Sequence, residues 1–308
     1  MKYKLSLLLF LLFCLLQSKI LAQHQRDSIM ILKNNSYLIT SGKVSFTVNP
    51  LVGGRITSFK LDDFNFLTGK EIEPNGYGST FWPAPQSMWV WPPIPALDNE
   101  PYSADDNGSS IKLISKEDPK TGFQFVKEFS AGKSNCINLK YTIINKSRET
   151  KKVAPWEISR TVKGGLLFFP MGKGKLGVKY FEPAPVDIIN GIAWYKDELK
   201  RPEKNQLSFA DGSEGWLAYA VKNKLFIKKF KDIKPESIAP GEGEVLFYVA
   251  SNADFIEVEV EGEYKSLEPG EKSLWNMEWI AKDIPANIKV EKGNKELVNF
   301  VREVVNNK

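Results

Sequence analysis

Three glutamates alternate with apolar residues over positions 255–261, and such carboxylates could act as acids or bases on a polar substrate. The alternation predicts a strand that carries Glu257, Glu259 and Glu261 on one face, with neighbouring carboxylates about 7 Å apart. Because like charges at this spacing repel, that face should lie against water, a cation, basic side chains or a polar ligand. Two interpretations stay open: a solvated outer face, or a ligand-facing surface with one working carboxylate.

A second group with chemical potential follows Pro155, where Trp156, Glu157 and Arg160 lie within five residues. In an extended segment Trp156 and Arg160 project from one face and Glu157 from the other. An indole, a carboxylate and a guanidinium are suited to recognising hydroxyl groups. An Arg–Glu pair that only stabilises the fold uses the same residue types, so both interpretations stay open.

Arg55 follows two glycines, Gly53 and Gly54. Glycine lets another part of the backbone approach closely, and the arginine would then present its guanidinium from the start of a strand. Two interpretations of Arg55 stay open: it contacts a ligand, or it forms an ion pair that stabilises the fold.

The segment 74–97 contains no charged residue and six prolines, and it carries Trp82, Trp89 and Trp91. This density of proline predicts irregular structure rather than a helix or a central strand. One interpretation is a loop that packs over an open end of the fold. The other is an aromatic platform for a ligand, because tryptophan stacks on the apolar face of a pyranose ring while its N–H bonds a hydroxyl.

The elements that must position these side chains are predominantly strands. Period-two alternation or short apolar runs bounded by turn residues occur throughout the chain. The predicted strands cover residues 43–48, 55–61, 111–115, 123–129, 138–145, 166–169, 178–181, 216–221, 225–230, 245–250, 255–260 and 274–280. Helical spacing of apolar residues occurs over 296–305. The pattern predicts an all-β fold, a large antiparallel sandwich with a short C-terminal helix. Since no linker divides the chain, we expect one domain over residues 36–308, preceded by an extension at 23–35.

The scarcity of histidine and cysteine excludes several kinds of catalytic site. His24 is the one histidine in the sequence, and it lies beside the expected end of the signal. A Ser–His–Asp triad, a Cys–His pair and a histidine-ligated zinc site are therefore excluded from the folded domain. Cys136 is the one cysteine outside the signal, so no intrachain disulfide can form, and we expect a core thiol.

Two short motifs resemble cofactor or metal sites without their required context. Residues 172–177 have the GxGxxG spacing, but strand-like residues and prolines follow where a dinucleotide site needs a helix. Residues 105–108 resemble a calcium turn but lack the closing glutamate. We expect no cofactor and assign no metal-binding residue, although the acidic strand leaves a calcium ion open.

Taken in their order, these segments resemble the galactose mutarotase-like (aldose 1-epimerase-like) superfamily. The matching segments are residues 49–56, 154–157, 257–264 and 267–271, with Trp279. Residues 82–86 and 91–93 make the chain most similar to an exported bacterial branch of unknown function. The resemblance spans residues 36–282 and implies a β-supersandwich.

The resemblance also implies roles for individual residues. A mutarotase holds its sugar in a concave sheet, where a histidine acid protonates the ring oxygen and a glutamate base takes the anomeric proton. By position, the base falls on Glu259 and the sugar-contacting arginine on Arg55. The place of the histidine falls on or beside Trp156 and Glu157, and tryptophan has no proton that titrates near neutrality. Glu157 with a raised pKa is a conceivable acid, but standard His/Glu mutarotation is not expected.

The first 22 residues resemble an export signal. Lys2 and Lys4 precede a predominantly apolar run of twelve residues, which suits a signal better than a permanent membrane span, and cleavage is expected near Ala22. We expect export to a periplasm or beyond, and not lipid anchoring at Cys14, because bulky Phe13 precedes it.

The charge of the chain is nearly balanced once this signal is removed. Three of the 42 basic residues lie within residues 1–22, which leaves 39 against 37 acidic residues. This balance gives no expectation of nucleic acid as a partner. We also expect no integral membrane segment after signal removal, and the oligomeric state stays open.

These observations lead to one main hypothesis and two rivals. The main hypothesis is an exported carbohydrate-binding or carbohydrate-processing protein that lacks the standard catalytic histidine. The first rival is an epimerase, hydrolase or lyase that works with Glu157 and Glu259, and the second is a structural module without a small ligand. The expected substrate-binding residues are Arg55, Trp82, Trp89, Trp91, Trp156 and Arg160.

Overall fold

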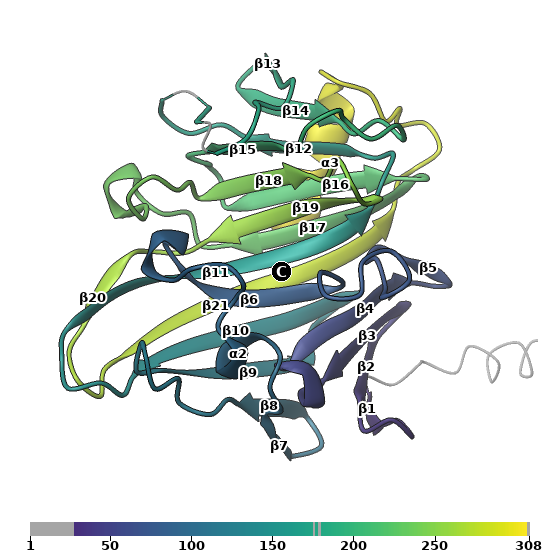
Figure 1. Cartoon of the computed structure of the whole chain (residues 1–308). Coiled ribbons are helices and arrows are strands. Elements are labelled where there is room, and N and C mark those ends of the chain that lie inside the picture. The colour runs from purple at the N-terminus through teal and green to yellow at the C-terminus, as the bar shows by residue number, and fades with distance from the viewer. Residues whose placement is uncertain (1–27, 175, 178–179, 307–308) are drawn as a thin grey trace, which may run out of the picture.

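The computed structural model describes residues 28–174, 176–177 and 180–306, and its strands form two antiparallel sheets (Figure 1). The expected signal at 1–22, with Cys14, and also His24 lie outside the described residues. No helix of the described part is long and apolar enough to span a bilayer.

The first sheet has eleven strands among the described residues. In order of pairing, nine of them are β1 (Ser28–Ile31), β2 (Tyr37–Ser41), β3 (Val44–Asn49), β4 (Arg55–Leu61), β6 (Ser79–Ala84), β11 (Lys151–Val162), β19 (Phe255–Glu261), β18 (Val245–Val249) and β15 (Gln206–Ala210). The remaining two are β5 (Phe64–Asn65), which pairs with β4, and β20 (Lys265–Leu267), which pairs with β11. Strand β1 falls within the segment that the sequence assigned to an extension.

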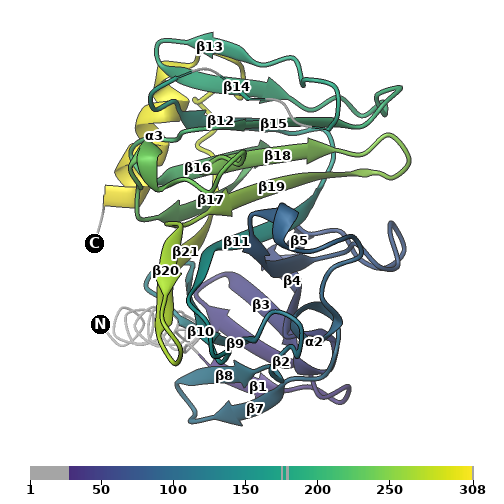
Figure 2. The same ribbon diagram turned by 60° about the vertical axis from the view of Figure 1, so that its left-hand side comes forward.

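The second sheet has ten strands among the described residues. They are β13 (Asp187–Ile189), β14 (Ile192–Lys196), β12 (Leu166–Pro170), β16 (Trp216–Val221), β17 (Lys224–Phe230), β21 (Lys272–Asp283), β10 (Cys136–Asn145), β9 (Phe123–Ala131), β8 (Ser110–Ile114) and β7 (Ser103–Asp106). Figure 2 shows helix α3 (Lys295–Asn306) against the outer side of this sheet, and its Leu297 and Val301 are fully buried there. The predicted all-β sandwich with a C-terminal helix is confirmed.

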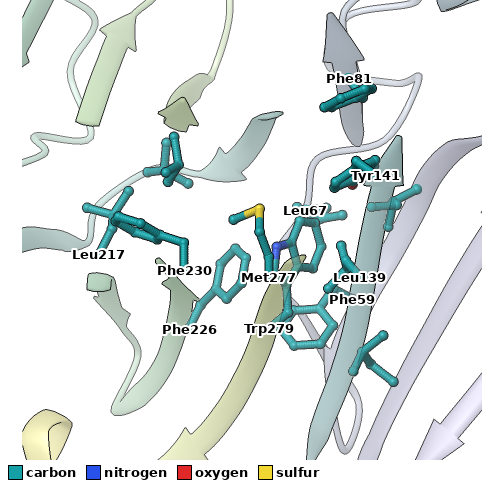
Figure 3. Packing of buried hydrophobic residues seen from close by; sticks show 14 of the residues in the cluster. Phe59, Leu67, Phe81, Leu139, Tyr141, Leu217, Phe226, Phe230, Met277 and Trp279 are labelled. Carbon is teal, nitrogen blue, oxygen red and sulfur yellow. The ribbon is translucent and has the colours of Figure 1, made fainter. Parts of the chain in front are cut away.

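The main core lies between the two sheets, because alternation along each strand points one row of apolar side chains inward. Figure 3 shows Phe59 from the first sheet beside Phe226 and Trp279 from the second. The Trp279 ring lies edge-on to Phe59 and Phe226, at centroid distances of 5.2 and 5.0 Å. These contacts hold the two sheets at a fixed spacing, so the outer face of the first sheet is a stable surface.

One sequence prediction about the proline-rich segment was wrong. Residues 79–84 form β6, which lies in the interior of the first sheet between β4 and β11. Proline is tolerated here because Pro83 lies directly opposite Pro155 of β11. The Pro155 carbonyl accepts from the Gly262 N–H and the Pro83 carbonyl from the Trp89 indole, so the backbone polar groups of both prolines point away from the other strand. Neither proline therefore removes a donor from the β6–β11 ladder, and the pairs on either side are kept. After β6 the segment is irregular apart from a 3-10 turn at Gln86–Met88 and the short helix α2 (Pro95–Asp98).

Candidate functional site

A cleft of about 1300 Å³ lies on the outer face of the first sheet. Its floor is formed by one face of four neighbouring strands, β6, β11, β19 and β18. The strand register aligns Trp82 of β6 with Trp156 of β11, and Arg160 of β11 with Glu257 of β19. Glu259 lies between Ile158 and Leu246 on the adjacent strands. Segments from distant parts of the chain therefore contribute to one cleft.

Four tryptophans gather at the β6 side of the cleft, with Trp82 at their centre. Its ring centroid lies 5.6 Å from Trp89, 5.9 Å from Trp91 and 5.3 Å from Trp156, and every pair is close to perpendicular. Trp89 is anchored by a hydrogen bond from its indole N–H to the Pro83 carbonyl, at 2.9 Å. Edge-to-face packing of this kind fixes the orientation of the rings, and all four tryptophans line the cleft.

Two arginines lie in the floor, and each already pairs with a carboxylate. The Arg160 Nε lies 2.8 Å from the Glu257 Oε1, and one of its terminal nitrogens donates to the Thr80 hydroxyl at 2.9 Å. The Arg160 guanidinium also lies 5.3 Å from the centre of the Trp82 ring, a cation–π contact. Arg160 is thereby held rigidly against the tryptophan cluster.

Arg55 pairs with Asp98 of α2 across 3.2 Å and lies 4.6 Å from the Tyr77 ring centre. The other oxygen of Asp98 accepts the indole N–H of Trp82 at 2.7 Å, so one aspartate orients both an arginine and a tryptophan. Gly53 makes this approach possible: it has φ +68°, and a Cβ there would lie 1.8 Å from the Asp98 carbonyl oxygen. The double glycine before Arg55 therefore positions α2 against the strand.

Glu259 is the acidic side chain of the cleft floor whose negative charge is least balanced by neighbouring groups. It is 2% exposed, and its Oε2 accepts the Trp156 indole N–H at 2.7 Å. Among the residues that the structure describes, no basic side chain forms an ion pair with it. Burial, reinforced by the negative charge of Glu257, raises the pKa of Glu259 well above its usual value. The environment of Glu259 therefore favours its protonated form more than water favours that of an exposed glutamate.

Glu157 lies on the opposite face of β11 and does not line the cleft. It is completely buried between the sheets, where Lys228 of β17 and the hydroxyls of Ser79 and Ser159 donate to it. Lys228 also donates to the Val258 carbonyl at 2.6 Å. Burial lowers the pKa of Lys228, while the charge of Glu157 acts in the opposite direction. The structure thus separates Glu157 from Glu259, the two carboxylates that the sequence assigned to one catalytic pair.

The other residues that the sequence assigned to the site all line the cleft. They are Arg55, Trp82, Trp89, Trp91, Trp156, Arg160 and Glu259. The sequence analysis missed Asp98, whose signal is a single acidic residue after an uncharged stretch. It also missed Phe181 and Tyr248, which lie 5.4 Å apart at the far side of the cleft. No local pattern could have found that pair, because it depends on the packing of the loop after β12 against β18.

A smaller groove, of about 520 Å³, lies on the outer face of the second sheet. Four of its five charged side chains form two pairs, Lys140 with Glu128 at 3.2 Å and Lys229 with Glu278 at 3.3 Å. No tryptophan is among its described lining residues. Across the described residues, no group of three or more His, Cys, Asp or Glu is arranged to hold a metal ion.

A family model described as "Domain of unknown function (DUF4380)" matches residues 83–282. This range contains β11, β18 and β19 and most of the cleft floor. No curated protein matches the sequence.

Solved structures with the same fold include several described as galactose mutarotase-like or aldose 1-epimerase-like. A putative aldose 1-epimerase from Escherichia coli K12 has a TM-score of 0.54 and 11% identity, over 81% of this chain and 99% of that one. A galactose mutarotase-like protein from Lactobacillus casei has a TM-score of 0.55 and 12% identity, over 80% of this chain and 100% of that one. A TPR-domain containing protein from Parabacteroides distasonis has a TM-score of 0.59 and 15% identity, over 83% of this chain and 49% of that one. At sequence identities of 11–15%, these comparisons show that the chain shares the fold of these proteins.

Proposed function

The chain belongs to the DUF4380 family of domains of unknown function, and on that premise we propose that it is a carbohydrate-binding protein whose site is the cleft on the first sheet. One observation carries the proposal: Arg55, Trp82, Trp156, Arg160 and Glu259 line a single cleft although they are up to 204 residues apart in the sequence.

The chemistry of the cleft fits a sugar. Indole faces of the tryptophan cluster match the apolar face of a pyranose ring, while Asp98, Glu257 and Glu259 offer acceptors for hydroxyl groups. The floor is preorganised, because Arg160 and Trp82 are each held by contacts made without a ligand. The fold shared with proteins described as aldose 1-epimerases adds support of a general kind.

Titration calorimetry against mono- and oligosaccharides tests this proposal. We expect at least one sugar class to bind, and we expect Trp156→Ala to weaken that binding at least tenfold. Leu274→Ala, an exposed apolar residue on the second sheet, serves as control and should bind as the wild type does. No heat of binding from any sugar, or equal binding by both variants, would count against a sugar site in the cleft.

A second candidate function is carboxylate-dependent glycoside chemistry, favoured by the raised pKa of Glu259. Glu257 follows on the same face of β19, about 7 Å away by the strand repeat; burial raises its pKa as well, while the ion pair with Arg160 acts in the opposite direction. The pKa of Glu259 is raised further than that of Glu257, and two carboxyls roughly this far apart suit the acid and the base of an inverting hydrolysis. Glu259 would donate its proton to the leaving oxygen, and Glu257 would take a proton from the attacking water.

Replacement of the acid separates binding from turnover. Glu259→Gln keeps an acceptor for the Trp156 N–H but cannot donate a carboxyl proton. If the protein is an enzyme, this variant should bind its sugar with little change while product formation falls at least 100-fold. Unchanged turnover in this variant would leave the protein as a binder without this chemistry.

We also propose that the chain is exported after removal of residues 1–22, and that one domain follows over residues 36–308. The basic start, the twelve-residue apolar run and the small residue Ala22 support the first part. Fractionation of expressing bacterial cells, with mass spectrometry of the mature N-terminus, checks it. A mature chain that keeps its first residues in the cytoplasmic fraction would overturn export.

A further inference from the structure

Exposed apolar side chains concentrate at the rim of the cleft. Ten large hydrophobic residues of the described chain are exposed, and four of them line the cleft: Val90, Trp91, Tyr180 and Phe181. Trp91 is 63% exposed although its ring edge packs on Trp82. Exposure of large aromatic rings is unfavourable in water, so their concentration at one site indicates a surface that a ligand covers.

These aromatic groups form two platforms at opposite ends of the floor. Trp91 packs on Trp82 of β6, while Phe181 packs on Tyr248 of β18. Three strand spacings separate β6 from β18, which is about 14 Å. The register places Tyr248 level with Arg160, four residues along β11 from the position level with Trp82, or about 13 Å. A single sugar ring cannot touch both platforms.

The volume of the cleft leads to the same conclusion. At about 1300 Å³ it exceeds the roughly 300–1,000 Å³ that small-molecule pockets usually have. One ring bound over Glu259 would leave most of that space, and both platforms, to water.

The charges of the cleft indicate which kind of chain fits. Five acidic and three basic side chains line it among the described residues. The two arginines of the floor are already paired with Asp98 and Glu257. The third basic side chain, Lys70, lies with its ammonium 5.3 Å from the centre of the Tyr77 ring. Even with Glu259 protonated, a negatively charged sugar would meet more carboxylates than basic groups, and both guanidiniums are already paired, so an uncharged chain is favoured.

We infer, on the basis of the proposed carbohydrate function, that the ligand is an uncharged oligosaccharide several rings long that lies diagonally across the strands from Trp91 to Phe181. The rings at its two ends would stack on these platforms, and the central ring would lie over Glu259.

Calorimetry with sugars of increasing length tests this inference. The probes are malto-, cello-, xylo- and N-acetylated chito-oligosaccharides of one to six rings, with oligogalacturonides of the same lengths as charged counterparts. We expect affinity in one neutral series to rise at least tenfold from one ring to the longer members and then to level off. The oligogalacturonides should bind more weakly than that neutral series.

Two rim variants locate the ends of the chain. Trp91→Ala and Phe181→Ala should each weaken binding of the long sugar about tenfold, and each should weaken it more than it weakens binding of a single ring. Both residues are exposed enough for the variants to fold, and Leu274→Ala is the control.

Equal affinity for one ring and for six would overturn the extended ligand and leave the proposed sugar site intact, as would unchanged binding of the long sugar by both rim variants. Tighter binding of oligogalacturonides would overturn the uncharged ligand. A complete lack of sugar binding would overturn the proposed function, and this inference with it.

Discussion

Glu157 and Glu259 lie on adjacent, paired strands of the same sheet, and both are buried to at least 98%. On the inner face, Glu157 receives hydrogen bonds from a lysine and two serines, so its charge is compensated. On the cleft face, Glu259 accepts one indole N–H and has Glu257 nearby, so its charged form is disfavoured. Equal burial therefore has different consequences: the inner carboxylate forms an ion pair within the core, while the charged form of the outer one is disfavoured.

The largest expected effect comes from breaking the inner pair. Glu157→Gln leaves the Lys228 ammonium buried without a counter-charge, and we expect the free energy of unfolding to fall by about 3–5 kcal/mol. Urea unfolding at pH 7 measures it. Glu157→Gln combined with Lys228→Met removes both charges and should recover part of the loss. A fall of less than about 1 kcal/mol in the single variant would mean that the pair does not stabilise the sandwich.

A medium effect is expected at the carboxylate that joins Arg55 to Trp82. Asp98→Asn keeps an acceptor for the Trp82 N–H but removes the charge beside Arg55, at a cost of about 2 kcal/mol. It should also weaken sugar binding, because Arg55 and Trp82 lose their shared anchor. The same unfolding assay and calorimetry check both effects, and wild-type affinity in a destabilised variant would exclude Asp98 from positioning the site.

Replacement of Glu259 should raise the free energy of unfolding, whereas the two replacements above lower it. Glu259→Gln removes a carboxyl whose ionisation is disfavoured by burial, so we expect a gain of about 1 kcal/mol in unfolding free energy at pH 8. The pKa of Glu259 is raised in the folded state, so its contribution to wild-type stability is fully present below the pKa of an unfolded glutamate, about 4.3. That contribution is lost as the pH rises from there through the pKa of Glu259 in the folded state. The advantage of the variant should therefore grow with pH between 5 and 8, and an advantage that is independent of pH would contradict the uncompensated carboxyl.

The smallest effect is expected for an ion pair on the outside of the second sheet. Glu278 and Lys229 lie 3.3 Å apart, and their side chains are 42% and 30% exposed. Water screens such a pair, so Glu278→Gln should change the unfolding free energy by less than about 1 kcal/mol. It should leave sugar binding unchanged. If Glu278→Gln lowered the unfolding free energy about as much as Glu157→Gln does, burial would not explain the difference between the exposed pair and the buried pair.

The strand pattern predicted much of this arrangement, but not which face of a strand meets the ligand. Alternation correctly placed Trp156 and Arg160 opposite Glu157. It could not show that Glu157 points inward, because both faces of β11 are buried and carry polar residues. Partners such as Lys228 and Asp98 come from other strands and helices, so their contribution depends on tertiary packing. Strand β6 was missed because the rule against proline in central strands did not allow for Pro83 and Pro155 at a paired position where both backbone nitrogens point away from the shared ladder.

The most direct test of the sugar cleft is a crystal structure of the protein with the tightest-binding oligosaccharide. We predict density for sugar rings over Glu259, against the tryptophan cluster and extending toward Tyr248. Density for the sugar in the groove between Glu128 and Lys229 on the second sheet, with the cleft filled by water alone, would contradict the account.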